Sequence, residues 1–209
     1  MEDGMKLFEY DGPLMRFFTF LSRLTLLNVV WFLGCLPIVT GGASTVGLYY
    51  AADRLRLGDP AVWKNFRIGW KRHWKQATPV WILFLLILFA FSYDYFILTD
   101  ERIWGNTILT VLAVISLATA VLTALWIYPV MINFRGSLPE LIGNAFIFAF
   151  MYAPLTLLGV GMYGLLVWLI LNHPVIGGVV IVFAQALIVY AMLLLDERAF
   201  QKYRGKKGE

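Results

Sequence analysis

Long uninterrupted apolar runs dominate the pattern of this 209-residue chain. A helix needs about 17–25 apolar residues to cross the hydrocarbon core of a bilayer. Five runs reach that length, and they predict membrane-spanning helices at residues 24–40, 79–98, 103–134, 141–171 and 175–195. These runs are continuous and lack the two-residue alternation of a transmembrane β-barrel. The pattern predicts an all-α polytopic transmembrane helical bundle of about five spans, forming a single integral membrane domain over residues 1–209.

The composition supports the bilayer as the solvent. Hydrophobic residues make up 60% of the chain and charged residues only 14%, whereas soluble domains contain about 25% charged residues. Aromatic residues reach 16%, as is typical of proteins whose rings lie at membrane–water interfaces. The single cysteine, Cys35, excludes an internal disulfide and any cysteine-based metal cluster.

The distribution of Lys and Arg predicts the orientation. These residues concentrate between the first two spans and after the fifth: Arg54, Arg56, Lys64, Arg67, Lys71, Arg72 and Lys75, then Arg198, Lys202, Arg204, Lys206 and Lys207. The loop between the second and third spans holds only Arg102. Because cytoplasmic loops are enriched in Lys and Arg, residues 50–77 and the C-terminus are expected in the cytoplasm. Five spans then place the N-terminus outside.

An alternative topology keeps the N-terminus inside. The five-span topology leaves Lys6, Arg16 and Arg23 in an external segment, which the charge rule disfavours. The alternative makes residues 43–53 a return toward the cytoplasm. Eleven residues rise only about 16 Å as a helix, so this segment would be re-entrant and would need protein around its backbone. The five-span topology is favoured, and the alternative stays open.

The first span is interrupted at its end. Pro37 lacks a backbone N–H and predicts that the helix ends or kinks near Leu36. The following glycine pair permits backbone angles closed to other residues, and Ser44 or Thr45 could cap a new helix. One interpretation is a helix–turn–helix at the cytoplasmic surface, and the other is a broken helix whose freed carbonyls bind a ligand. The candidate broken-helix motif consists of Pro37, Thr40, Gly41, Gly42 and Ser44.

Residues 60–76 predict a helix that lies in the membrane interface. Its aromatic residues recur at i, i+3, i+7 and i+11, with cations over the remainder of the helix. Such a helix anchors a protein against anionic lipid, and the alternative is a docking surface for a cytoplasmic partner. The candidate residues are Trp63, Lys64, Phe66, Arg67, Trp70, Lys71, Trp74 and Lys75.

A weak internal duplication is also predicted. Tyr128–Pro129 follows the third span as Leu36–Pro37 follows the first. In each half, a span would run inward, leave at a proline, continue through a linking helix and return outward. Parallel repeats of this kind occur in membrane transporters.

Several motifs resemble one family. The run Leu36–Pro37–Ile38–Val39–Thr40–Gly41–Gly42–Ala43–Ser44, the pair Tyr49–Tyr50, the segment Trp74–Lys75–Gln76–Ala77 and the N-terminal Leu7–Phe8–Glu9–Tyr10–Asp11–Gly12–Pro13 resemble the YesL-like bacterial membrane proteins. The resemblance implies a small multi-span protein of the bacterial plasma membrane without an established biochemical activity. Genes of this family often lie beside carbohydrate-uptake transporters, which implies an accessory or partner subunit of a carbohydrate-uptake (ABC-type) system.

The chain offers little that resembles catalytic chemistry. His73 and His173 are expected on opposite membrane faces, and no HExxH, GxSxG or P-loop motif is present. The ionisable residues at the ends of spans, Arg23 and Asp94, lie close to an interface. We therefore expect a non-enzymatic protein with no catalytic, metal or cofactor site. Its expected partners are the lipid bilayer and transporter subunits, and no nucleic acid. The alternatives are a small permease that acts as an oligomer around residues 37–44 and a purely structural assembly factor.

Overall fold

The computed structural model describes residues 12–98 and 107–204, and within them the chain is helical with no β-strand. Five of the helices contain a stretch long and apolar enough to cross a membrane, which confirms the predicted all-α membrane-bundle class. The elements are α2 (Pro13–Cys35), the 3₁₀ turn η1 (Ile38–Thr40), α3 (Gly41–Arg56), α4 (Val62–Leu98), α5 (Thr107–Asn133), α6 (Leu138–Met151), α7 (Ala153–Asn172) and α8 (Pro174–Arg204).

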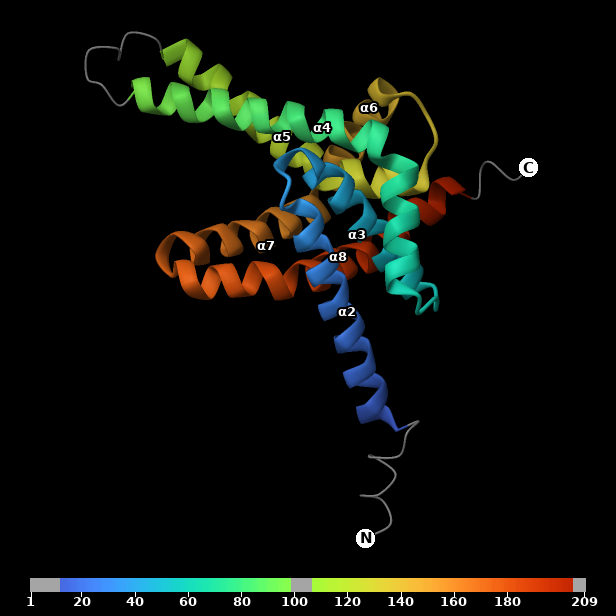
Figure 1. The fold of residues 1–209 in the computed structure, drawn as a ribbon. Coiled ribbons are helices and arrows are strands. Elements are labelled where there is room, and N and C mark those ends of the chain that lie inside the picture. Colours follow the sequence, from blue (N-terminus) through green and yellow to red (C-terminus); the bar gives the residue numbers. More distant parts are fainter. Residues whose placement is uncertain (1–11, 99–106, 205–209) are drawn as a thin grey trace.

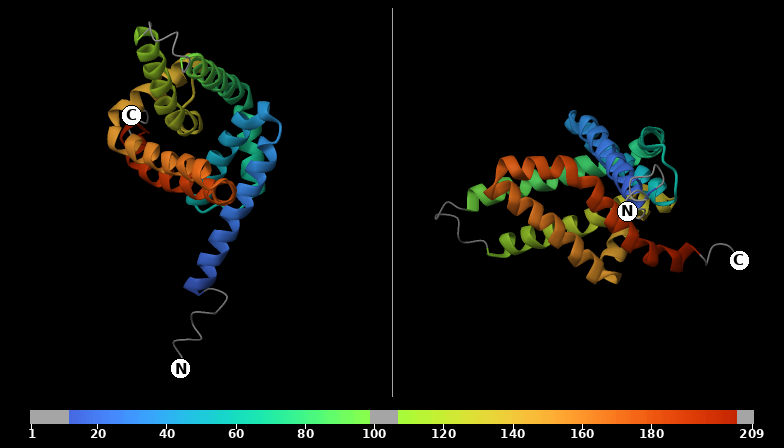
Figure 2. Two further views of the ribbon diagram at one scale, coloured as in Figure 1. Left: turned by 90° about the vertical axis from the view of Figure 1, so that its left-hand side faces the viewer. Right: turned by 90° about the horizontal axis from the view of Figure 1, so that it is seen from below.

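Two helical pairs extend to the same side of a central helix. Figure 1 shows the second part of α4 beside α5, and α7 beside α8, with both pairs reaching to the left from α3. Helix α2 runs across this direction in Figure 1, and the two views of Figure 2 agree. The four paired helices therefore run along approximately the same direction, and α2 runs across it.

The first half of the chain differs from the predicted boundaries at two places. The first long apolar helix begins at Pro13 instead of residue 24, because proline suits the first helical position and the arginines of α2 are tolerated in a helix. The predicted interfacial helix and second span are joined in α4, with Pro79 inside it. Helices in membranes tolerate an internal proline because neighbouring groups satisfy the freed carbonyl. Figure 1 shows α4 changing direction between its two parts.

The second half differs at one place. The single span predicted at residues 141–171 is wrong, because α6 and α7 are separate helices that meet at Tyr152. Pro154 cannot donate a helical hydrogen bond, and beside this junction the Thr156 hydroxyl donates to the Ala149 carbonyl at 2.7 Å. The same hydroxyl accepts a hydrogen bond from Trp126 Nε1 at 2.9 Å. The other two predicted spans agree with α5 and α8, although residues 103–106 lie outside the described residues.

Helix α3 is the centre of the structure. Twelve of its sixteen residues are buried. It lies antiparallel to the first part of α4 at short range, because a Cβ on Gly42 would lie 2.4 Å from the Ala77 carbonyl oxygen and one on Gly69 would lie 2.5 Å from the Tyr50 Cβ. Glycines that let two backbones approach this closely are typical of helix packing in membranes.

Aromatic stacking connects α3 to the second half of the chain. The rings of Tyr49 in α3 and Tyr128 in α5 stack with centroids 5.7 Å apart. Around this core the outer surface is strongly apolar, and Phe89, Leu171 and Val175 are each more than 70% exposed. A surface of this kind suits contact with lipid tails.

Candidate functional site

The chain breaks where the sequence predicts. Helix α2 ends at Cys35, η1 follows Pro37, and α3 begins at Gly41. Thr40, and not the predicted Ser44 or Thr45, occupies the N-cap position of α3. Its hydroxyl lies within donating distance of the Gly34 carbonyl at 2.7 Å and of the Pro37 carbonyl at 2.9 Å. Thr40 therefore closes the end of α2, and Ser44 is buried inside α3.

Other side chains occupy the remaining carbonyls near the break. Trp81 Nε1 in α4 donates to the Ile38 carbonyl at 2.8 Å. The Thr45 hydroxyl donates to the Gly41 carbonyl at 2.8 Å and accepts from Trp31 Nε1 at 3.3 Å. A ligand site at a broken helix needs backbone groups that face a cavity. Here the Gly34, Ile38 and Gly41 carbonyls accept hydrogen bonds from protein side chains, and the Pro37 carbonyl accepts one from the Thr40 backbone N–H, which favours a structural turn.

The two glycines of the motif serve packing. Gly41 has an ordinary helical φ of −54°, so the backbone freedom predicted for the pair is not used. A Cβ on Gly41 would lie 2.8 Å from the Trp81 ring, and Gly42 faces the Ala77 backbone as described above. Among the residues described, positive φ occurs at Gly58, with φ 92°, just after α3 ends.

The predicted aromatic face of residues 60–76 is divided in the structure. Phe66 is buried and Trp70 is half-buried against the core, whereas Trp63 is 61% exposed and Trp74 is 44% exposed. At about 100° per residue the four rings spread over about 80° of the helix circumference. These four aromatic residues thus lie along the boundary between the side of α4 that faces α3 and the side that faces outward.

The cations of this segment lie outward. Lys64, Arg67, Lys71 and Lys75 are exposed, and the Lys75 ammonium lies 5.9 Å from the centre of the Trp74 ring. The residues that face α3 include Asn65, Gly69 and His73, which are buried. Sequence reasoning did not place these three residues against another helix, although their i, i+4, i+8 spacing marks one helical face.

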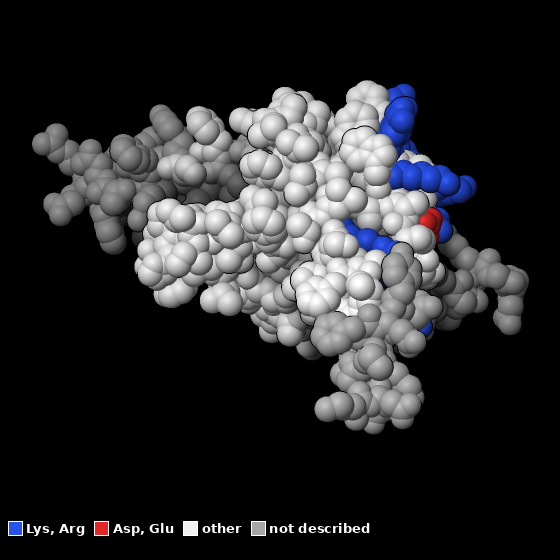
Figure 3. Space-filling model, turned by 60° about the horizontal axis from the view of Figure 1, so that its bottom comes forward, with Lys and Arg blue, Asp and Glu red and all other residues white. Residues whose placement is uncertain are grey.

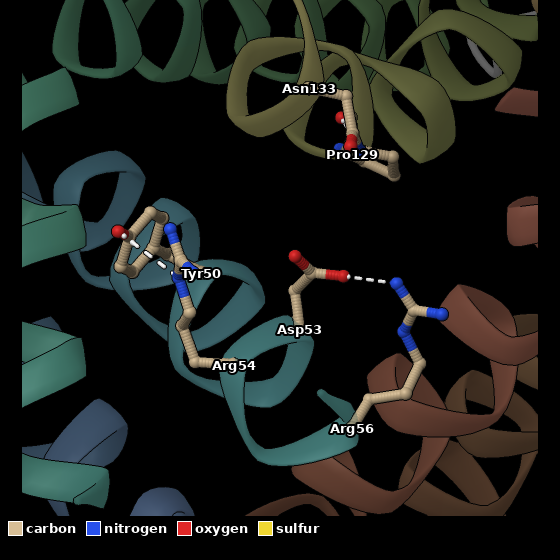
Figure 4. Close-up of polar contacts among 6 residues, drawn as sticks. All are labelled: Tyr50, Asp53, Arg54, Arg56, Pro129 and Asn133. Atoms are coloured by element: carbon tan, nitrogen blue, oxygen red, sulfur yellow. Dashed lines mark hydrogen bonds and ion pairs between the residues drawn. The ribbon is translucent and has the colours of Figure 1, made fainter. Parts of the chain in front are cut away.

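Charged residues collect where α3 ends. Arg56 pairs with Asp53 at 2.7 Å, and Arg54 lies over the Tyr50 ring, 5.2 Å from its centre. Figure 4 shows these side chains together, with Asn133 at the end of α5 across from them. Figure 3 shows Lys and Arg gathered toward one end of the face in view. The described part of the molecule therefore has a cationic end.

The loop after α3 leads tightly into α4. The Ala61 backbone N–H donates to the Asp59 carboxylate at 3.0 Å. This bond is the largest cause that holds the pKa of Asp59 below its usual value. Asp59 therefore stays ionised just before α4, where a negative charge interacts favourably with the dipole of the helix.

Contacts between α2 and α8 define how α2 lies against the bundle. Asn28, fully buried, accepts a hydrogen bond from the Ala186 backbone N–H at 2.6 Å and donates to the Phe183 carbonyl. Eight residues earlier, Phe20 packs on Tyr190 with ring centroids 5.0 Å apart. The N-terminal part of α2 thus lies nearer the C-terminal end of α8.

Some predicted positions fall outside these observations. The side chain of Asp94, Lys6, residues 7–11 and the tail from residue 205 lie outside the described residues. In the described ranges no group of three or more His, Cys, Asp and Glu side chains could hold a metal ion. The order long helix, short helix, long helix occurs in both halves, and the duplication stays a prediction.

Comparison with known proteins gives one similarity. A family model described as "Protein of unknown function, DUF624" matches residues 24–95, a segment that covers the second part of α2, η1, α3 and most of α4. No curated protein and no solved structure matches the chain. The similarity thus covers the break and the α3–α4 contact, and it connects this region to an uncharacterised family.

Proposed function

We propose that this chain is a non-catalytic subunit of a bacterial membrane complex. The complex we favour is a carbohydrate-uptake (ABC-type) system, in which the chain is an accessory or partner subunit. The link to carbohydrate uptake rests on the resemblance to the YesL-like proteins. The membrane setting is supported by five helices apolar enough to span a bilayer.

The observation that carries this proposal is the closed packing at the centre of the bundle. A permease needs a binding site near the middle of the membrane, lined by free backbone or side-chain groups. Here α3 fills the centre with twelve buried residues. The carbonyls of Gly34, Ile38 and Gly41 at the break accept protein hydrogen bonds. This packing supports a subunit that binds other proteins over one that forms a transport path.

The cationic end of the molecule indicates which side of the protein faces the cytoplasm. The first part of α4 and the end of α3 carry exposed Lys and Arg residues, and the charge rule puts such residues in the cytoplasm. The C-terminal end of α8 is then also cytoplasmic. Trp63 and Trp74 lie exposed at the two ends of the cationic segment, where they suit the headgroup region.

The α2–α8 contacts support a cytoplasmic N-terminus. From Phe20 to Asn28, α2 moves from the level of Tyr190 to the level of Ala186, that is, about 6 Å away from the cytoplasmic end of α8. Helix α3 then returns along α4 from Ala77 toward residue 66. We therefore propose that α2, η1 and α3 form a re-entrant hairpin, so that four helices cross fully. Arg16 and Arg23 then obey the charge rule, unlike in the five-span topology.

Partner recovery tests the function. The tagged chain, purified in mild detergent from its native membrane, should bring transport subunits with it, identified by mass spectrometry. Exchanging Lys64, Arg67 and Lys71 for Gln separates docking from anchoring, because a docking surface loses the partner while the protein stays inserted. Unchanged recovery leaves this helix as a lipid anchor. Purification without any transport subunit would contradict the accessory role.

Liposome uptake tests the permease alternative. Purified protein alone should not accelerate oligosaccharide uptake into liposomes. Saturable uptake by a monodisperse preparation would favour a permease and overturn the proposal.

A further inference from the structure

A polar cavity lies between the first part of α4 and the end of α5. Its volume is about 410 Å³. The lining residues come from two separate segments: Arg72, His73 and Gln76 in α4, and Met131, Ile132, Asn133, Phe134, Arg135 and Gly136 at the end of α5 and in the linker to α6. The cavity is therefore built from parts of the chain about sixty residues apart.

One hydrogen bond holds the two walls together. The Gln76 side-chain amide donates to the Gly136 carbonyl at 3.0 Å. His73 is a buried residue of the lining, and Asn133 is fixed by donation to the Pro129 carbonyl at 2.9 Å. Arg135 thus lies in a linker that the Gln76–Gly136 hydrogen bond connects to α4, the helix that contains Arg72.

The charges around the cavity favour an anion. Two arginines, Arg72 and Arg135, line it, and no acidic side chain does. Glu140, which is not among the lining residues, accepts a hydrogen bond from the Ser137 backbone N–H at 3.0 Å and closes the start of α6. This carboxylate approaches Gly136 from outside the cavity lining. It lowers the local positive potential without occupying the cavity.

We propose that this cavity binds a phosphate group. Arginine offers a planar pair of donors that match phosphate oxygens. The α4 side of the cavity ends at Gln76, three residues before Pro79, where α4 passes from its cationic part into its apolar part. Phosphate at this depth comes from an anionic lipid headgroup or from a soluble phosphate ester in the cytoplasm, and both present the same chemistry to the two arginines.

A second hollow serves as an internal control. It is lined by Trp63, Lys64, Arg67, Ile68 and Lys71, all from one exposed stretch of α4. It has three cationic residues, against the two arginines of the cavity, and no second wall. Removing two charges there changes the net charge as much as removing the two arginines of the cavity.

Binding is measured by native mass spectrometry on the full chain in a non-ionic detergent. The probes are dioctanoyl phosphatidylglycerol, glycerol 3-phosphate and inorganic phosphate. Arg72→Gln with Arg135→Gln should weaken binding about a hundredfold, at about tenfold for each charged hydrogen-bond donor. Lys64→Gln with Lys71→Gln should change it less than about threefold, because neither lysine lines the cavity.

The probes distinguish the sources of phosphate. Binding of phosphatidylglycerol alone identifies a lipid-headgroup site, and equal binding of glycerol 3-phosphate identifies a site for soluble esters. If no probe binds the wild-type protein, or if both double variants lose binding equally, the proposal is wrong. Should the glutamine variant fail to fold, Arg72→Lys with Arg135→Lys keeps the charge and loses the paired donors. The affinity of this lysine variant for the probe should fall about tenfold, and unchanged binding would contradict the assigned arginine geometry.

Discussion

Helices α3 and α7 have opposite relations between composition and burial. Helix α3 is rich in glycine and alanine and ends in charged residues, yet twelve of its sixteen residues are buried. Helix α7 is almost entirely apolar, yet only three of its twenty residues are buried. Lipid tails solvate large apolar side chains, so the protein core is marked by small residues that let backbones approach. Apolar character alone therefore does not indicate burial here, because α3 is buried largely through small residues and α7 exposes most of its apolar ones.

The largest expected effect is the difference between adding one methyl group to α3 and adding one to α7. Gly42→Ala in α3 places a Cβ 2.4 Å from the Ala77 carbonyl oxygen and 2.5 Å from the Trp81 Cβ. Since the backbone of α4 must move, we expect a loss of about 3 kcal/mol in unfolding free energy. Gly161→Ala in α7 meets nothing within 4 Å and should be neutral or stabilising by about 0.5–1 kcal/mol. Thermal unfolding in detergent measures both, and equal effects would contradict the contrast.

A smaller effect is expected from two asparagines. Asn28→Ala removes both hydrogen bonds from α2 to the α8 backbone and should cost about 1–2 kcal/mol, the upper range for polar contacts between membrane helices. Asn172→Ala at the end of α7 removes a local bond to the Trp168 carbonyl at an exposed position, and should cost less than about 0.5 kcal/mol. Denaturation in mixed micelles compares the two variants. A larger loss from Asn172→Ala would argue against the α2–α8 register.

The smallest effect concerns the turn that leads into α3. Thr40→Val removes a hydroxyl that bonds the Gly34 carbonyl, and should cost about 1 kcal/mol. Thr25→Val removes a bond to the Leu21 carbonyl four residues earlier, where the helix backbone remains bonded, so its effect should be close to zero. The same unfolding measurement checks both. A null result for Thr40→Val would mean that the break is not closed by this side chain.

The sequence predicts the lipid-facing helices better than their junctions. The candidate spans Val114–Asn133 and Pro174–Asp196 lie in α5 and α8 and agree with predicted spans, because uninterrupted apolar runs specify helices in a bilayer. The junctions differ because proline has two outcomes in a membrane. Pro79 lies inside a continuous helix, whereas Pro154 follows a break between two helices. Local sequence does not distinguish these outcomes, since the hydrogen bonds at the second break come from Thr156 and from Trp126, which lies in a different helix.

The position of the break was predictable, and its chemistry was not. Pro37 and the following glycines predict the interruption from backbone properties alone. Their contact with Trp81 depends on α4, forty residues away, and no local pattern indicates it. The cavity at Arg72 and Arg135 was likewise missed, because it needs two segments that only the folded chain brings together.

The most direct test of the account is the side of the membrane on which the N-terminus lies. Single cysteines are introduced as Glu2→Cys, Thr99→Cys and Lys206→Cys in a Cys35→Ala background, and intact spheroplasts are treated with an impermeant thiol reagent. If α2, η1 and α3 form a re-entrant hairpin, position 99 is labelled at once, and positions 2 and 206 are labelled only after the membrane is permeabilised. Labelling of position 2 together with position 99 in intact spheroplasts would place the N-terminus outside, make α2 a full span and contradict the hairpin.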